Sequence, residues 1–286
     1  MTDLSTQATT VESHSRTIRW LRHGAPAAAG RGLSALTPVL ATVAIVAGLQ
    51  LLVATGAIDE RVFPRPTSIG SELWDHVQQG SFWESVLRTL EGWALGLGLA
   101  IVVAVPLGIA IGSSSSAYRS VRFVVDFVRP IPSIALLPLF ILLFGIGMSL
   151  KTYIVALGCF FPLFFQTMYG VQSVDPITLE TARAYRLGPL MRFVFVSLPG
   201  ATPMIATGLR ISASIALLLA VGTEMVVGVP GIGYDIYRAQ YAGERPAAFA
   251  LIAASGVLGV LMAIGFNRIE RVTLRWHPSQ RRESGE

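Results

Sequence analysis

The sequence carries little charge for its length. Of its 286 residues, 14% are charged and 52% are hydrophobic, and the mean hydropathy is +0.60. Soluble domains have about 25% charged residues, so this depletion is typical of a protein that lives in lipid. The net charge of +5 lies at the ends of long apolar runs, as in membrane proteins, which argues against nucleic acid as a partner.

Cysteine and lysine each occur only once. The single cysteine, Cys159, excludes an intrachain disulfide and a cysteine-based metal site, and its apolar surroundings predict a buried, inert thiol. The single lysine, Lys151, has no glycine-rich loop before it, so the chain lacks the P-loop of an ATPase. The triplet 231–233, GIG, lacks the strand and helix of a nucleotide-binding loop and is interpreted as an external turn.

Acidic and histidine side chains are missing from the middle of the apolar runs. The four histidines lie outside the runs, and the nearest carboxylates lie at run ends, at Glu91, Asp126, Asp175 and Glu224. A proton- or sodium-coupled carrier typically has acidic groups well inside its spans. We therefore expect no catalytic residue, metal site or cofactor in this chain, and an energy source in another chain.

Six apolar runs are long enough to cross a bilayer, whose core of about 30 Å requires about 20 helical residues. Five lack Asp, Glu, Lys and Arg, and one contains Arg210 alone; the runs are 32–58, 92–118, 130–150, 152–174, 203–223 and 246–267. They predict an all-α integral membrane protein with six transmembrane helices. We divide it into an N-terminal helix at 33–56, an extracytoplasmic segment at 57–79 and a five-helix core at 80–270.

The basic residues predict the orientation. With the N-terminus inside, the inner segments 1–35, 113–129, 173–200 and 268–286 hold 15 Lys and Arg, whereas the outer segments 55–85, 147–151 and 223–247 hold 5. Such a bias over short loops indicates cytoplasmic termini. Residues 1–32 are predicted to be a disordered cytoplasmic tail, and 271–286 a second cytoplasmic tail.

Two patterns describe how the spans are expected to pack. Residues 68–91 have apolar side chains at helical spacing, which suits one amphipathic helix lying along the membrane surface and leading into the second span. Small residues recur four apart at Gly92 and Gly96, and again at Gly108 and Gly112. This spacing favours close contact between spans.

A polar segment, 173–200, interrupts the most apolar part of the chain. Asp175 and Pro176 predict a helix start, with Asp as the cap. A helix over 177–187 is expected to end at Gly188–Pro189, a second piece to follow, and Leu198–Pro199 to turn the chain back towards the bilayer. A mere connection is the alternative, but such connections are usually short, so we interpret the segment as a docking surface for a partner.

Glu180–Thr181–Ala182, followed by Leu198–Pro199, resembles the EAA motif of permease subunits of bacterial ABC importers. Thr181 replaces the middle alanine of that motif, Arg186 occupies its glycine position, and Gly188 comes two residues later. The blocks RPIPSIALLPLFILLFGIG, VALGCFFPLFFQTMYGVQSVD, EMVVGVPGIGYDIY and RIERVTLRWHP are similar to the nitrate, sulfonate and taurine branch, and within it to the aliphatic sulfonate permeases.

The resemblance implies a type I importer permease in a bacterial plasma membrane. Its partners would be a second, usually identical permease subunit, two separate ATPase subunits that use ATP and Mg, and an extracytoplasmic substrate-binding protein. It implies alternating-access import of a small anion, an aliphatic sulfonate foremost, with taurine, nitrate or a similar anion as alternatives; a self-sufficient secondary carrier or channel is the competing function. The implied ATPase-coupling residues are Glu180, Thr181, Ala182, Arg183, Arg186, Gly188, Leu198 and Pro199.

A second group of residues is predicted to belong to the pathway or a gate: Ser133, Arg210, Ser212 and Glu224. Arg210 is the strong base within a span, and its role is left open between anion contact and a structural position at a subunit interface or inner gate. Glu224 would repel an anion, so a salt bridge or a contact with the binding protein is expected.

Two further features of the third run and its approach stay open. Pro130, Pro132 and Pro138 predict a break in the run, as a gating hinge or a static kink. Arg122, Asp126 and Arg129 share a helical face and are interpreted as a solvated, internally paired stripe.

Overall fold

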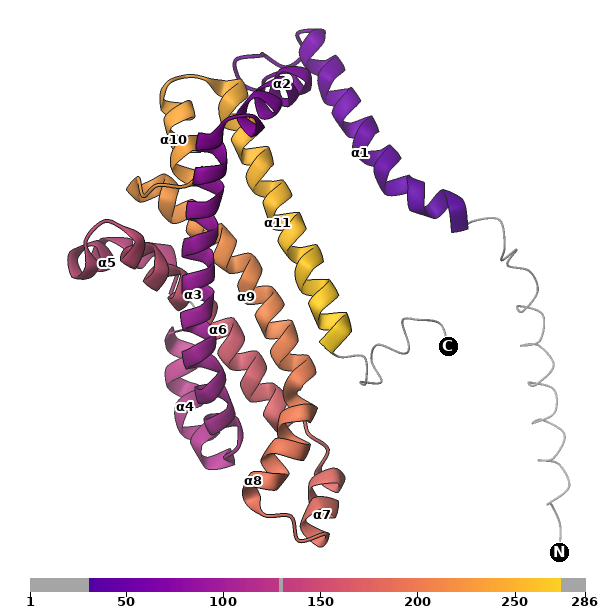
Figure 1. The fold of residues 1–286 in the computed structure, drawn as a ribbon, viewed down its shortest axis with the longest axis vertical. Coiled ribbons are helices and arrows are strands. Elements are labelled where there is room, and N and C mark those ends of the chain that lie inside the picture. The colour runs from indigo at the N-terminus through magenta and orange to yellow at the C-terminus, as the bar shows by residue number, and fades with distance from the viewer. Residues whose placement is uncertain (1–30, 129–130, 274–286) are drawn as a thin grey trace, which may run out of the picture. The chain divides into compact units, whose positions relative to one another are not determined.

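The computed structural model describes residues 31–128 and 131–273 (Figure 1). Regular structure in these ranges is helical throughout, as predicted. The chain divides into two compact units, residues 1–57 and 58–286, and the first contains α1 (Arg31–Ala54). The second contains α2 (Pro66–Val77), α3 (Gly80–Gly112), α4 (Ser115–Val128), η1 (Ser133–Leu136), α5 (Leu137–Phe144), α6 (Met148–Gln172), α7 (Pro176–Ala184), α8 (Pro189–Arg192), η2 (Phe193–Ser197), α9 (Leu198–Val227), α10 (Ile232–Tyr241) and α11 (Arg245–Thr273). The predicted tails fall almost entirely outside the described residues.

Four helices of the described chain are long and apolar enough to cross a membrane. They are α3, α6, the continuous helix Pro189–Val227 formed by α8, η2 and α9, and α11 up to Val272. Two shorter apolar helices, Leu40–Ala54 within α1 and Ser133–Phe144, occupy the remaining predicted runs. The six apolar segments are therefore helical, in the predicted order.

The third run, 130–150, is shorter as a helix than its composition predicts. Its twelve helical residues in η1 and α5 rise only about 18 Å, because Gly145, with φ of 70°, ends the helix. Pro138 lies in the first turn of α5, where proline is compatible with a helix, and Pro130 lies outside the described residues. The side chains of the proposed stripe Arg122, Asp126 and Arg129 are likewise outside the description.

The predicted amphipathic helix over 68–91 is two helices instead of one. Gln78 and Gln79 separate α2 from α3, so the prediction of a single helix is wrong at this point. The apolar face itself is real, because Phe82 and Val86 are buried in a cluster with residues of α10 and α11 such as Ile232 and Leu251.

Helices α3, α6 and α9 form the core of the second unit (Figure 1). The predicted small-residue contacts lie along the seam between α3 and α6. A Cβ atom built on Gly96 would lie 2.5 Å from Val155 Cβ, and one on Gly112 would lie 2.8 Å from the backbone oxygen of Met168. Gly98, on the same helix, has nothing within 4 Å, so the close approach is specific to one face.

This seam predicts opposite effects for two alanine substitutions in α3. Gly96→Ala is expected to lower the stability of the purified protein in detergent by about 1–3 kcal/mol, because the new methyl group overlaps Val155 and forces the helices apart. Gly98→Ala is the matched control and is expected to be neutral or to stabilise by up to about 1 kcal/mol, since alanine favours helix. Thermal unfolding of both variants checks this, and equal midpoints would contradict it.

Candidate functional sites: an exposed hairpin and a buried ion pair

The polar segment folds as a helical hairpin at one end of the bundle (Figure 1). Its first helix, α7, starts as predicted, because Asp175 Oδ1 accepts a hydrogen bond of 3.0 Å from the Ile177 N–H, and Pro176 occupies the first turn. An aspartate cap satisfies a backbone donor that has no partner within the helix and also favours the positive end of the helix dipole. The helix is thus fixed by its own sequence.

The end of α7 explains the shifted glycine of the motif. The Leu187 N–H donates to the Ala182 carbonyl at 3.1 Å, and the Arg186 N–H donates to the Arg183 carbonyl at 2.9 Å. This pair of bonds is the Schellman ending, which requires a left-handed residue that is usually glycine. Arg186 adopts that conformation, with φ of 57°, whereas Gly188 has φ of −62°. The turn therefore stays at the motif's glycine position although arginine occupies it.

Because arginine is strained in this conformation, Arg186→Gly is expected to stabilise the protein by about 1 kcal/mol. Gly188→Ala is the control and is expected to change little, since any residue adopts its backbone angles and a Cβ atom there meets nothing within 4 Å. Thermal unfolding in detergent measures both. Destabilisation by Arg186→Gly together with Gly188→Ala would show that the left-handed residue is elsewhere.

The second half of the hairpin corrects one prediction. Leu198–Pro199 does not turn the chain, because the helix runs unbroken from Pro189 to Val227. Pro199 lies in the first turn of α9, where its missing N–H breaks no α-helical bond. The five residues Phe193–Ser197 before it form a π-helical turn, a wider winding that also releases the backbone ladder at this point.

The hairpin exposes large apolar side chains beside charged ones. Ile177 is 71% exposed, Tyr185 79% and Leu190 74%. The predicted coupling residues Glu180, Thr181, Arg183 and Arg186 are also exposed, whereas Ala182 is buried. Lipid would not accept this many charges, and water would not favour these apolar groups. A mixed surface of this kind marks a protein interaction site.

At the opposite end of the core, two charged side chains are completely buried against each other. Lys151 of α6 and Glu224 of α9 each have 0% exposure, and Lys151 Nζ lies 2.9 Å from Glu224 Oε1. Lys151 Nζ also donates to the carbonyl of Arg88 at 2.8 Å. Sequence analysis placed Lys151 in an outer loop, and that assignment is wrong, because α6 begins at Met148 and encloses the side chain.

The second carboxylate oxygen ties the pair to α3 and α10. Glu224 Oε2 accepts hydrogen bonds from the Thr89 hydroxyl at 2.9 Å and from the Gly233 N–H at 3.0 Å. Thr89 in turn accepts from the Ile232 N–H at 3.0 Å. A Cβ atom at Gly231 would lie 2.2 Å from the Glu224 carboxyl carbon. The GIG triplet is therefore a close-fitting wall of the ion pair as well as a turn.

The salt bridge, one of the two expectations for Glu224, is present, but its partners escaped sequence analysis. A usable signal was available: two lone opposite charges lie at the outer ends of consecutive antiparallel spans, and two glycines follow the acidic one. Thr89 and the Gly233 N–H had no such signal, since their role depends on the packing of α3 and α10 against α9.

The other predicted pathway residues lie apart from one another. Arg210 Nη1 lies 3.3 Å from both Glu270 Oε2 and Asn267 Oδ1 of α11. The Ser212 hydroxyl is buried and donates to the Cys159 carbonyl at 3.1 Å, so it joins α9 to α6. Cys159 is itself a buried free thiol, as predicted. Ser133 lines a cavity between η1, α6 and α9.

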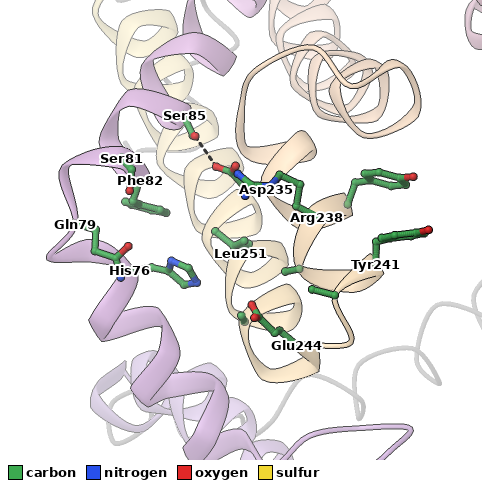
Figure 2. A pocket seen from close by; sticks show the side chains of 14 residues that line it. His76, Gln79, Ser81, Phe82, Ser85, Asp235, Arg238, Tyr241, Glu244 and Leu251 are labelled. Carbon is green, nitrogen blue, oxygen red and sulfur yellow. Dashed lines mark hydrogen bonds between the residues drawn. The ribbon is translucent and has the colours of Figure 1, made fainter.

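A larger hollow of about 450 Å³ lies between α2, α3, α10 and α11. Figure 2 shows His76, Ser85, Asp235, Arg238 and Glu244 around it, with the Ser85 hydroxyl donating to the Asp235 carboxylate. Its charges are of both signs, so it does not concentrate positive potential for an anion. No group of three metal-ligating side chains occurs among the residues that the structure describes.

Long apolar helices carrying a polar helical hairpin at one end define a permease of the ABC importer class. Residues 104–274 match the family described as binding-protein-dependent transport system inner membrane component, and the chain belongs to this family. It is accordingly a multi-pass inner-membrane protein.

Individual relatives agree with this family. The aliphatic sulfonates transport permease SsuC of Escherichia coli is 32% identical over 85% of this chain and 93% of its own length. The taurine transport permease TauC of the same organism is 28% identical, covering 92% and 95%, and the nitrate import permease NrtB of Leptolyngbya laminosa is 27% identical, covering 83% and 88%. The resemblance to the nitrate, sulfonate and taurine branch is thereby confirmed.

A solved structure agrees with the fold. A chain of the inward-facing MetNI methionine ABC transporter superposes with a TM-score of 0.60 at 21% identity, over 67% of this chain and 95% of that one. At this level of identity the likeness concerns the fold alone, and it supports the predicted type I permease architecture.

Proposed function

We propose that this chain is the membrane subunit of an ATP-driven importer that carries a small oxyanion into the cell. The observation that carries the proposal is the exposed hairpin: its ends are fixed by a cap and a Schellman turn, while its outer surface presents apolar side chains with no partner within the described chain. An aliphatic sulfonate is the first candidate cargo, because SsuC is among the relatives; taurine and nitrate follow from TauC and NrtB.

The proposed mechanism is alternating access driven from outside this chain. Two separate ATPase subunits bind ATP and Mg and receive α7 in a groove, and an extracytoplasmic binding protein delivers the anion at the other end. A second permease subunit, identical to this one, completes the pathway. Closure of the ATPases moves the two hairpins together and opens the core outward, and hydrolysis resets it. In this arrangement both termini and the hairpin are cytoplasmic.

The competing function, a self-sufficient secondary carrier, is not favoured by the charges inside the core. Lys151 is paired with Glu224, and Arg210 with Glu270. A carrier coupled to protons or sodium ions needs an acidic group that binds and releases the ion during the cycle. The buried carboxylate of Glu224 is instead held by three donors of the protein, from Lys151, Thr89 and Gly233.

Reconstitution in liposomes tests the proposal. The complete assembly of permease, ATPase and loaded binding protein is expected to take up a sulfonate only when ATP is supplied. The purified permease alone is expected to hydrolyse no ATP and to take up nothing under an ion gradient. Gradient-driven uptake by this chain alone would instead establish a secondary carrier or a channel.

A further inference from the structure

A cavity of about 370 Å³ between η1, α6 and α9 has a polar lining without charge. Its walls include Ser133, Gly158, Phe161, Gln166 and Tyr169, and none of its lining residues is Asp, Glu, Lys, Arg or His. This volume is within the range of small-molecule sites. It differs from the hollow of Figure 2, whose lining carries charges of both signs.

Gln166 gives this cavity an unmet hydrogen-bonding requirement. Its side-chain carbonyl oxygen is buried and has no hydrogen-bond partner in the described part of the chain. The residue cannot move away into α9, because a Cβ atom at Gly208 would already lie 2.7 Å from Gln166 Cβ. Buried polar atoms in proteins nearly always have partners, so an amide left unpaired on a cavity wall indicates a group that enters the cavity.

Ser133 and Tyr169 place two hydroxyl groups on the same wall. Ser133 is held close to α6, since a Cβ atom at Gly158 would lie 3.3 Å from its Oγ. Two hydroxyls and a terminal amide, whose NH₂ group is a double donor, supply neutral donors for the oxygens of an anion. A buried arginine or lysine would bind the anion far more strongly, whereas a transport site must also release it.

We propose that this cavity is a contact site for the transported oxyanion, with Gln166, Ser133 and Tyr169 as its hydrogen-bond donors. The inference rests on the proposed function and adds the side chains that the anion meets inside the membrane. The absence of a carboxylate from the lining removes repulsion of the cargo, and the absence of a cation prevents trapping.

The test is uptake of ethanesulfonate, taurine and nitrate by the complete assembly in liposomes. Gln166→Leu and Ser133→Ala are each expected to lower uptake about tenfold, the effect of one lost hydrogen bond in the transport step, while ATP hydrolysis stimulated by the binding protein stays within about twofold. Thr167→Val is the matched control, because Thr167 also carries a buried hydroxyl without a partner but packs against Gly108 of α3. Wild-type uptake in both cavity variants would overturn the proposal.

A labelling experiment covers variants that fail to assemble or transport. In a Cys159→Ala background, Ser133→Cys is expected to react faster with the anionic 2-sulfonatoethyl methanethiosulfonate than with its cationic trimethylammonium analogue, and excess cargo should slow the reaction. Equal rates and no protection would overturn the cavity site. A wild-type assembly that takes up none of the three anions would instead overturn the proposed function, and the rate comparison would still decide the site.

Discussion

Lys151→Met is expected to destabilise the protein by about 3–5 kcal/mol, the largest stability effect of any substitution considered for this chain. The change leaves the Glu224 carboxylate fully buried without its counter-ion, and an uncompensated buried charge is far more costly than the lost attraction itself. The Arg88 carbonyl loses a donor as well. The midpoint of thermal unfolding in detergent measures the loss, with folded protein quantified by size-exclusion chromatography.

The double variant Lys151→Met with Glu224→Met is the control for this interpretation. It removes both charges, so it is expected to recover most of the stability, as apolar replacements of buried ion pairs do. Thr89 and Gly233 still lose their acceptor, which keeps the recovery incomplete. A double variant as unstable as Lys151→Met would mean that packing around the lysine stem, rather than the unpaired charge, causes the loss.

Glu180→Arg is expected to lower ATP-driven uptake by the complete assembly about 100-fold. The exposed Glu180 lies on the hairpin surface assigned to the ATPase, and a reversed charge in a protein interface costs several kcal/mol, of which about 3 kcal/mol corresponds to this factor. Stability should be unchanged because the side chain is exposed. Uptake and co-purification of the ATPase subunit are the two measurements.

Asp75→Arg provides a matched charge reversal on α2, at an exposed position outside the hairpin. It is expected to leave uptake and co-purification unchanged, and Glu180→Gln should give an intermediate loss. If Glu180→Arg supports normal uptake in an assembly that contains its ATPase, the hairpin is not the coupling surface.

Much of the architecture could be predicted from the sequence because membrane helices reveal themselves locally. An apolar run without charge must form backbone hydrogen bonds within itself, so the helices α3, α6, α9 and α11 follow from composition. The start of α7 is equally local, since Asp175 and Pro176 act on the next few residues. The glycine seam between α3 and α6 followed from spacing alone.

The errors have the opposite cause: they concern residues whose structure depends on distant partners or on single backbone angles. Lys151 resembles a loop residue until Glu224, 73 positions later, lies against it. The third run appears long enough to span the membrane because composition does not register the left-handed angle at Gly145. Leu198–Pro199 resembles a stop, yet a proline in the first turn of a helix is compatible with its continuation.

The unbroken helix from Pro189 to Val227 has a mechanical consequence. Its 39 residues make a rod of about 58 Å, with the cytoplasmic socket proposed for the ATPase at one tip and the electrostatic clasp around Glu224 near the other. A stiff rod delivers a displacement from tip to tip instead of dissipating it in a flexible joint. Its single soft spot is the π-helical turn at Phe193–Ser197, so a stroke received at the socket either bends the rod there or pulls on the clasp.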